Sequence, residues 1–179
     1  MKVTLRKLKL SDTTHFTELA NNPKIWQTMR DGFPYPYAVE DAIKFINFSH
    51  KVKEKNSIFA IEYNGELVGA TGLHGQADIN RFSMELGYWI GEPYWSKGIA
   101  TKAVALITDF GFKNLNINRI FAGTIEGNLA STKVLEKNHF KFEGISKKSA
   151  YKNNEFKDEY HFAILKTDYL SNQRDKKQL

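Results

Sequence analysis

The sequence predicts a single α+β domain, a three-layer α/β arrangement in which helices flank a mixed, mostly antiparallel central sheet. Apolar residues alternate with polar ones in several segments, as in half-buried strands, and follow helical spacing in others. Near the middle of the chain these segments run strand, helix, strand, helix. No internal repeat or flexible linker divides the 179 residues, and this length suits one domain. We therefore assign residues 1–170 to one domain and 171–179 to a polar C-terminal tail.

The N-terminal segments predict a strand followed by helices. Residues 3–9 alternate with period two and predict a strand, after which Ser11 is the expected N-cap of a helix. Pro23 opens a second short helical segment. A loop rich in aromatic residues and proline follows at 32–37, and helical spacing returns from residue 39 to about residue 55.

The middle of the chain changes to period two. Residues 57–63 and 66–73 predict a hairpin, because the Asn64-Gly65 pair between them favours the positive φ angles of a primed turn. Residues 81–90 predict the next strand. One face of that strand carries Phe82, Met84, Leu86, Tyr88 and Ile90, and the other carries Ser83, Glu85, Gly87 and Trp89.

The second half of the chain predicts two helices and three strands. In order, these are a helix at 99–112, a strand at 119–125, a helix from Asn128 to about 138, and strands at 140–152 and 155–165. Asn153-Asn154 is the expected turn between the last two strands. The tail at 171–179 is polar and charged, so we expect it to be frayed.

The composition excludes several kinds of site. The chain has no cysteine, which excludes disulfides, thiolate metal sites, iron–sulfur clusters and a cysteine nucleophile. Lys and Arg outnumber Asp and Glu by 26 to 20, so the net charge of +6 favours anionic partners such as nucleic acid, a phosphorylated cofactor or an acidic surface. The histidines lack metal-ligand spacing, and we expect no metal. With no signal-peptide pattern and no apolar stretch of membrane-spanning length, a cytoplasmic location is expected.

The junction between the strand at 81–90 and the helix at 99–112 is a candidate anion site. The first turn of a helix has free backbone N–H groups and the positive end of the helix dipole. Gly98 and Ala100 keep this turn clear of bulky side chains, and Lys97 adds a positive charge. Neither a Walker P-loop nor a dinucleotide-binding glycine pattern occurs. The simpler alternative is a strand-to-helix turn whose glycine suits the backbone geometry.

Around this junction the sequence resembles a known family. The residues that carry the resemblance are Glu85-Leu86-Gly87-Tyr88-Trp89-Ile90, the run from Tyr94 to Ala103, Asn118-Arg119-Ile120, Asn128-Leu129-Ala130-Ser131 and Phe140-Lys141-Phe142-Glu143-Gly144. They resemble motif A and the following segments of the GNAT N-acetyltransferases, in the branch of the Rim-type ribosomal-protein N-terminal acetyltransferases. Trp95 stands where the family usually has Gln or Arg. The resemblance implies acetyl transfer from acetyl-CoA to a primary amine, and a sheet that is splayed at the cofactor-binding strand.

The same resemblance implies where acetyl-CoA binds. Backbone amides from Ser96 to Thr101 would hold the pyrophosphate, and the backbone of Trp89 and Ile90 would pair with the pantetheine arm beside a bulge in the strand. The implied cofactor-binding residues are Trp89, Ile90, Trp95, Ser96, Lys97, Gly98, Ile99, Ala100, Thr101 and Asn128.

Three residues are candidates for catalysis. Glu85 is the candidate base, acting through water; the alternative is an exposed carboxylate that balances Arg81 or another cross-strand cation. Asn128 would bind pantetheine or orient the amine, or it would simply cap its helix. Ser131 would lie near the thiol, or it would be an ordinary polar residue of the first helical turn. Leu135 stands at the position where many GNAT enzymes have a tyrosine acid. Because no cysteine can carry the acyl group, direct attack by the amine in a ternary complex is expected.

The acceptor is expected to bind near the N-terminal helices. Trp26, Phe33, Tyr35 and Tyr37 would wall its pocket, or this aromatic loop would cap the core. His74 ends a central strand near the site and is a weaker candidate.

A protein N-terminal α-amine is one candidate acceptor, and a polyamine, amino acid or antibiotic is the alternative; a non-catalytic acyl-CoA sensor is a further alternative. Partners other than these, such as nucleic acid or a membrane, are not expected, and the chain is expected to be a monomer or homodimer.

Overall fold

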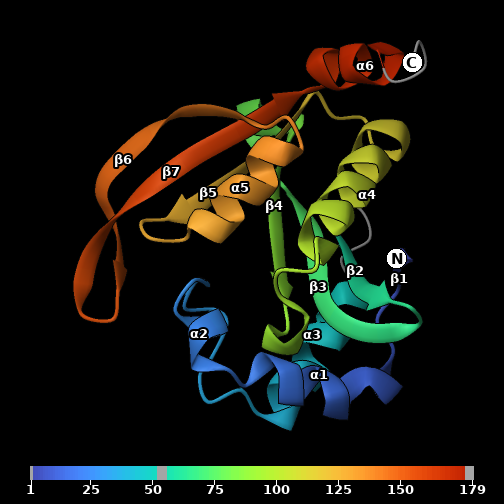
Figure 1. Ribbon diagram of the computed structural model, residues 1–179, viewed down its shortest axis with the longest axis vertical. Helices are drawn as coiled ribbons and strands as arrows, with labels where there is room; N and C mark the ends of the chain where they lie inside the picture. The colour runs from blue at the N-terminus through green and yellow to red at the C-terminus, as the bar shows by residue number, and fades with distance from the viewer. Residues whose placement is uncertain (1, 52–55, 176–179) are drawn as a thin grey trace.

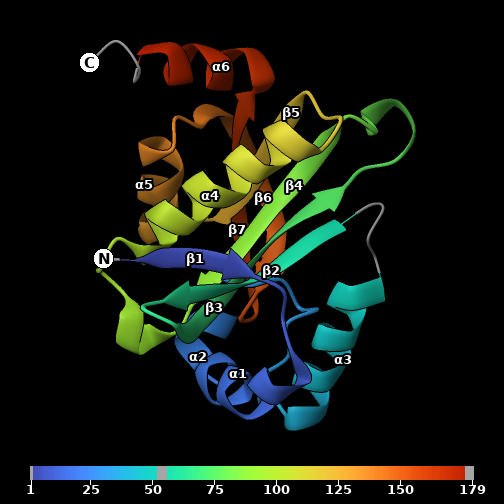
Figure 2. The same ribbon diagram turned by 90° about the vertical axis from the view of Figure 1, so that its right-hand side faces the viewer.

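The computed structural model describes residues 2–51 and 56–175. A seven-stranded sheet runs through this part of the chain in the order β1-β2-β3-β4-β5-β7-β6. Neighbouring strands are antiparallel except β4 and β5, which are parallel. The predicted mixed, mostly antiparallel sheet is therefore confirmed. Figure 2 shows α1, α2 and α3 on one side of the sheet and α4 and α5 on the other.

The N-terminal elements follow the predicted order. They are β1 (Val3–Arg6), a 3₁₀ turn (Leu10–Asp12), α1 (Thr13–Ala20), α2 (Pro23–Trp26) and α3 (Val39–Lys51). Ser11 is not the N-cap, because it lies inside the 3₁₀ turn and α1 begins two residues later. Asp12 precedes α1, and its carboxylate accepts hydrogen bonds from Arg6 at 2.7 and 2.8 Å. The predicted end of α3 near residue 55 lies outside the described residues.

The central strands match the sequence prediction, except that the strand predicted at 81–90 begins at Ser83, two residues after the predicted start, so Phe82 lies outside it. They are β2 (Asn56–Tyr63), β3 (Glu66–Gly75) and β4 (Ser83–Ile90), with a 3₁₀ turn (Asp78–Asn80) before β4. Asn64 and Gly65 have φ angles of 52° and 91°, as a primed turn requires.

The second half adds a helix that the sequence did not predict. Its elements are a 3₁₀ turn (Glu92–Tyr94), α4 (Ile99–Asn114), β5 (Arg119–Ile125), α5 (Leu129–Lys137), β6 (Lys141–Lys152), β7 (Glu155–Leu165) and α6 (Lys166–Asp175). The prediction of a frayed tail was wrong for residues 171–175, because α6 continues through them. Residues 176–179 lie outside the described part of the chain. Tyr169 anchors α6 by packing its ring 5.0 Å from that of Phe112.

The sheet separates two groups of core residues. On the α4 and α5 side, Leu86 and Ile120 belong to a cluster that includes Leu135. On the α1–α3 side, Trp89 packs with Phe16 and Ile46. The two faces predicted for the strand at 81–90 therefore point to different layers, as expected. Among the described residues, none of the helices is long and apolar enough to span a membrane.

The sheet is splayed between β4 and β5. Their parallel pairing covers only Ser83 to Glu85 on β4, after which the strands diverge. β5 stays paired with β7 along its whole length and turns away with the β6–β7 hairpin (Figure 1). The predicted bulge was wrong, because β3 and β4 pair in unbroken register from Gly69–Ile90 to Gly75–Met84. The splay thus comes from β5 leaving β4, not from an extra residue in β4.

Candidate active site

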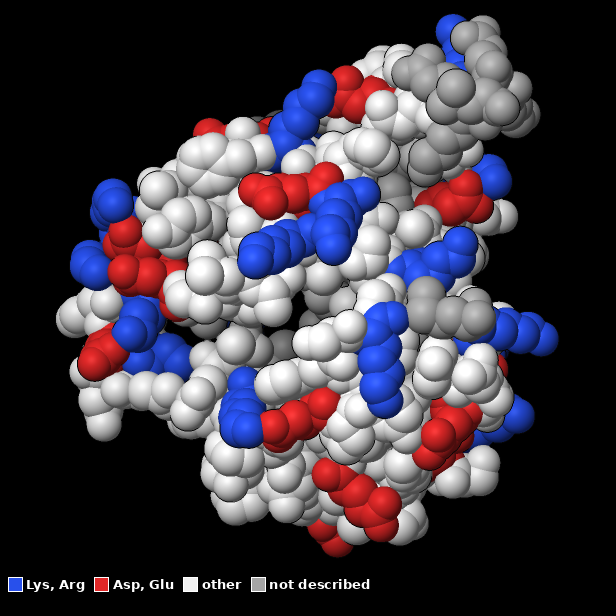
Figure 3. All heavy atoms as spheres, viewed as in Figure 1, with Lys and Arg blue, Asp and Glu red and all other residues white. Residues whose placement is uncertain are grey.

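A cavity of about 1420 Å³ lies at the splay. Its walls come from α2 and the loop after it, from α3, from β3, β4 and β5, from the first turn of α4, and from α5. Figure 3 shows the same region as a hollow at the centre of the front face, with basic side chains around it. The cavity thus joins the helix-start region near Gly98 to the sheet face that carries Glu85.

The start of α4 has the geometry of an anion site. Gly98 is the N-cap residue, with a left-handed φ of 72°, and its carbonyl accepts the first helical hydrogen bond from Lys102 N at 3.1 Å. The preceding N–H groups, from Ile99 to Thr101, have no acceptor within the described part of the chain. Trp95 fixes the loop to β4, because its indole N–H donates to Ile90 O at 2.6 Å. The predicted junction therefore presents free amides to the cavity.

Nearly all the predicted cofactor-binding residues line this cavity. The lining includes Trp89, Ile90, Trp95, Ser96, Gly98, Ile99, Ala100, Thr101 and Asn128. Lys97 does not line it. Its ammonium donates to Pro93 O at 2.9 Å and lies 5.3 Å from the centre of the Tyr94 ring. The cations that do line the cavity beside α5 are Lys133 and Lys137.

Glu85 lies on the cavity wall and is paired with an arginine. Arg30, from the loop after α2, donates to Glu85 Oε1 at 2.5 Å and lies 3.9 Å from Glu159 Oε1. Arg81, which the sequence offered as a partner, instead donates to Asp78 O. The ion pair therefore joins the loop to the sheet at the cavity wall, and it uses one of the two oxygens of the Glu85 carboxylate.

His74 lies directly opposite Glu85 in the β3–β4 register and lines the same cavity. Its ring occupies space left by two glycines: a Cβ at Gly72 would lie 3.2 Å from His74 Nε2, and one at Gly87 would lie 3.7 Å away. Burial lowers the pKa of His74, and the nearby Arg30 guanidinium lowers it further, although the Glu85 carboxylate acts in the opposite direction. The imidazole is therefore neutral at pH 7.

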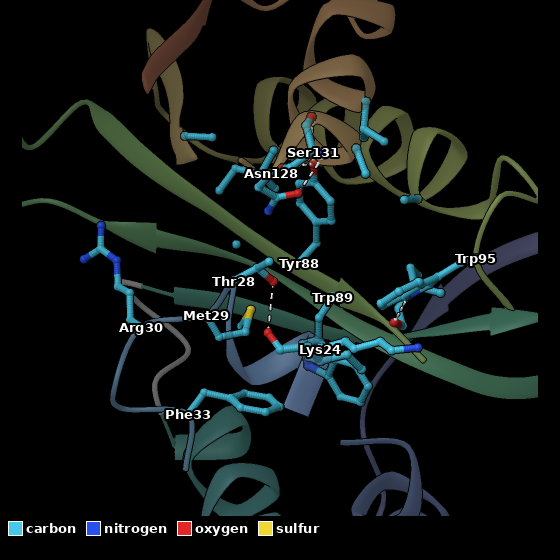
Figure 4. Close-up of a pocket in the computed structure, with 18 of the residues that line it drawn as sticks. Lys24, Thr28, Met29, Arg30, Phe33, Tyr88, Trp89, Trp95, Asn128 and Ser131 are labelled. Carbon is cyan, nitrogen blue, oxygen red and sulfur yellow. Dashed lines mark hydrogen bonds between the residues drawn. The ribbon is translucent and has the colours of Figure 1, made fainter. Parts of the chain in front are cut away.

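Three polar side chains meet where β4 and α5 face each other (Figure 4). Asn128 Oδ1 accepts the Ser131 N–H at 3.1 Å, which confirms that Asn128 caps α5. Ser131 Oγ lies 2.7 Å from the Tyr88 hydroxyl. Burial raises the pKa of Tyr88 to about 12. Leu135 is fully buried in the core and does not line the cavity.

The predicted aromatic wall divides into two parts. Phe33 and Tyr37 line the cavity, and the Phe33 ring packs 5.8 Å from that of Trp89. Trp26 and Tyr35 do not line it; their rings pair with each other at 5.8 Å. The buried Lys152 covers Trp26, since its Nζ lies 4.0 Å from the centre of that ring. Trp26, with Tyr35 packed beside it, therefore contacts the β6–β7 hairpin from outside the cavity.

A family model described as an acetyltransferase (GNAT) domain matches residues 2–141. The chain belongs to the GNAT acetyltransferase family. It is thus an N-acetyltransferase by family, as the resemblance implied, and the splayed sheet is the one that family membership leads us to expect.

Where the names of proteins similar to this GNAT chain include an acceptor, the acceptors differ. It is 29% identical to an uncharacterized N-acetyltransferase, p20, of Bacillus licheniformis over 94% of this chain and 95% of the relative. It is 26% identical to a spermidine N(1)-acetyltransferase of Escherichia coli K12 over 94% of this chain and 89% of the relative. Among solved structures, the fold matches RimL, a ribosomal L7/L12 alpha-N-protein acetyltransferase in complex with coenzyme A, with a TM-score of 0.81. That match has 23% identity and covers 92% of this chain and 94% of the other.

Several cavity residues of this GNAT chain were not predicted from the sequence. They are Thr28, Met29 and Arg30 after α2, Phe45 and Phe48 on α3, Tyr88 on β4, and Lys133 and Lys137 on α5. The sequence could have indicated Tyr88 as a site residue, because it is the one residue with a hydroxyl on the otherwise apolar face of its strand. The sequence could not have indicated Arg30, because the local pattern of an exposed loop does not show which strand an arginine side chain reaches.

Proposed function

We propose that the protein transfers the acetyl group of acetyl-CoA to a primary amine by direct attack in a ternary complex, with a protein N-terminal α-amine as the first acceptor to test. The observation that carries this proposal is the continuity of the cavity. It connects the free amides at the start of α4 with the Glu85 carboxylate, past the polar groups at the start of α5.

The lining residues fit the chemistry of acetyl-CoA. The amides of Ile99, Ala100 and Thr101 suit the pyrophosphate, because they are unpaired donors at the positive end of a helix dipole. Lys133 and Lys137 add positive charge on the neighbouring helix. Beyond Glu85, β4 has no strand partner on its β5 side, so its backbone can pair with the amides of the pantetheine arm.

Glu85 would remove the proton from the attacking ammonium, directly or through water, since only the neutral amine has a lone pair for the thioester carbon. The Arg30 ion pair is compatible with this role, because Arg30 is largely exposed and an exposed ion pair is weak. Asn128 would hold the pantetheine arm or the amine with its side-chain amide N–H, since its side-chain oxygen already caps α5.

Glu85→Gln tests this assignment. The substitution keeps the shape of the side chain and removes its basicity, so we expect the rate of acetylation to fall about 10²- to 10⁴-fold. Glu155→Gln is the matched control, because Glu155 pairs with Lys157 on the far hairpin and does not line the cavity. Acetyl-CoA consumption and product mass give the readout. A Glu85→Gln enzyme as fast as the wild type would contradict the assignment.

The acceptor is tested in the same assay with two sets of amines. One set consists of peptides with free N-termini, and the other of small amines that include spermidine, the acceptor named for a relative. Acetylation of the peptides at the α-amine supports the first acceptor. Acetylation of small amines alone moves the proposal to that class. Coenzyme A binding without acetylation of any amine would favour the acyl-CoA sensor.

A further inference from the structure

The Tyr88–Ser131 hydroxyl pair spans the gap between β4 and α5. Tyr88 points from the strand toward the helix, away from the Trp89 and Phe33 side of the sheet (Figure 4). Its hydroxyl lies 2.7 Å from Ser131 Oγ and 3.3 Å from Ser131 O. Both residues line the cavity. The pair therefore lies between the helix start that suits the phosphates and the carboxylate proposed as base.

The fold does not require this hydroxyl pair. The N-terminus of α5 is already capped by Asn128, so the Ser131 side chain is not needed for that purpose. The Tyr88 ring packs against the apolar core on the α4–α5 side, where a phenylalanine ring would serve equally well. At Leu135 the helix has no group that could donate a proton, and that side chain is enclosed in the core. The two hydroxyls thus line the cavity at this gap as donors that capping does not use, together with the side-chain amide of Asn128.

We infer that Tyr88 is a positioning residue for the leaving group. Either hydroxyl of the pair can be the donor, and when Tyr88 donates to Ser131 Oγ, the Ser131 proton is left free to point toward the sulfur of coenzyme A. This inference rests on the proposed function. As the amine nitrogen bonds to the carbonyl carbon, the C–S bond breaks and its electron pair stays on sulfur. Ser131 gives its proton to that sulfur, and Tyr88 gives its proton to Ser131. The first proton of the ammonium stays with Glu85, and the second, which the nitrogen loses as the amide forms, passes through water to Tyr88.

The environment of Tyr88 suits a donor. Burial is the main cause of its raised pKa, and the hydrogen bond with Ser131 acts in the opposite direction. The hydroxyl therefore stays protonated across the neutral range, where the transfer takes place. A buried hydrogen bond is also stronger than one in water, which favours a fixed orientation of Ser131.

The absence of cysteine gives a direct test that needs no acceptor. In a complex of the protein with coenzyme A, the cofactor sulfur is the one thiol present. Its ionisation can be followed by ultraviolet thiolate absorbance as the pH is raised, after the titration of the same variant without coenzyme A is subtracted to remove the signal of the tyrosines. We expect Tyr88→Phe to lower the thiolate fraction of bound coenzyme A about tenfold at a fixed pH, and Ser131→Ala to lower it at least as much. Ser131→Thr, which keeps a hydroxyl, should restore it.

Tyr160→Phe is the matched control. Tyr160 is also half-buried and packs on the same core, but its hydroxyl makes no hydrogen bond within the described part of the chain, and it does not line the cavity. This variant should titrate like the wild type. The inference is overturned if the thiolate fraction in Tyr88→Phe equals that of the wild type. If Tyr88→Phe does not fold, an unchanged thiolate fraction in Ser131→Ala overturns it equally.

Kinetics supply a second readout once an acceptor is known. Tyr88→Phe should lower kcat about 10- to 100-fold with little change in KM for acetyl-CoA. The double variant Tyr88→Phe/Ser131→Ala should be no slower than Ser131→Ala alone, because the two groups act in series. Additive losses would contradict the series arrangement. If no amine is acetylated, the proposed function fails, and the thiol titration still decides the role of Tyr88.

Discussion

At the scale of single residues, His74 has a buried ring that needs two neighbouring glycines for space, and it also lies in the candidate active site. The sheet provides room for its ring through Gly72 and Gly87, and sets it opposite Glu85. The ring makes no hydrogen bond to the protein among the residues that the structure describes, and burial keeps it neutral. A neutral imidazole beside a carboxylate can accept a proton without adding positive charge against an incoming ammonium.

The lowered pKa of His74 predicts how stability depends on pH. In the unfolded chain the imidazole takes up a proton near pH 6.5, whereas in the folded protein it does so only at lower pH. The unfolded state thus binds more protons in this window, so the free energy of unfolding should fall as the pH is lowered through it. Urea unfolding between pH 7.5 and about 5 checks this. His74→Gln should show a flatter dependence; an identical slope would contradict the assignment.

At the scale of elements, the close approach of β3 and β4 explains a glycine in the middle of a buried strand. A Cβ at Gly69 would lie 2.1 Å from Trp89 O and 3.0 Å from Ile90 Cα, which are backbone atoms that cannot turn aside. Trp89 and Ile90 also line the cavity. Gly69 therefore sets the position of the strand end that we expect to bind pantetheine.

Gly69→Ala should push β4 away from β3. We expect the free energy of unfolding to fall by about 3 kcal/mol, measured by urea titration, because the added methyl group overlaps backbone. Coenzyme A should also bind more weakly, since Trp89 and Ile90 would shift. Gly32→Ala is the control, because no atom lies within 4 Å of the added Cβ, and its stability should change by less than about 0.5 kcal/mol. Equal effects of the two substitutions would refute the close-approach argument.

At the scale of the whole molecule, the net charge of +6 has a local meaning. Basic side chains lie on several sides of the hollow on the face shown in Figure 3, with acidic side chains beside some of them. Five basic residues line the cavity, against the carboxylates of Asp41 and Glu85; they are Lys24, Arg30, Lys44, Lys133 and Lys137. A cavity with an excess of positive charge attracts a polyanion, and this attraction weakens as dissolved salt screens the charges.

Removing the two α5 lysines should weaken coenzyme A binding. We expect Lys133→Ala/Lys137→Ala to raise the Kd about tenfold at low salt, as measured by calorimetry, and to reduce the dependence of Kd on salt. Pantetheine, which has no phosphate, should bind both proteins equally. Lys157→Ala, on the far hairpin, should leave the Kd unchanged. An equal loss of affinity for pantetheine would show that the lysines act through the fold and not through phosphate.

Much of the fold was predictable because its signals are local. The hairpin at Asn64-Gly65, the strand Arg119–Ile125 and the cap at Asn128 depend on residues within a few positions of each other. The sequence missed α6, whose polar residues carry little periodicity and whose order depends on Tyr169 packing against α4. It also placed Ser11 as a cap, because a 3₁₀ turn before α1 has no local signature that distinguishes it from a helix start.

By itself, the sequence determined the order of the elements from β1 to β7, the two faces of β4 and the free amides at the start of α4, since each depends on neighbouring residues. Only the tertiary structure decided which distant groups meet. Arg30 reaches Glu85 across 55 positions, Tyr88 reaches Ser131 across 43, and Lys152 reaches Asp31 across 121. Such pairs depend on strand order and on where β5 leaves β4. Local propensity carries no information on either, because both are settled by how the layers pack together.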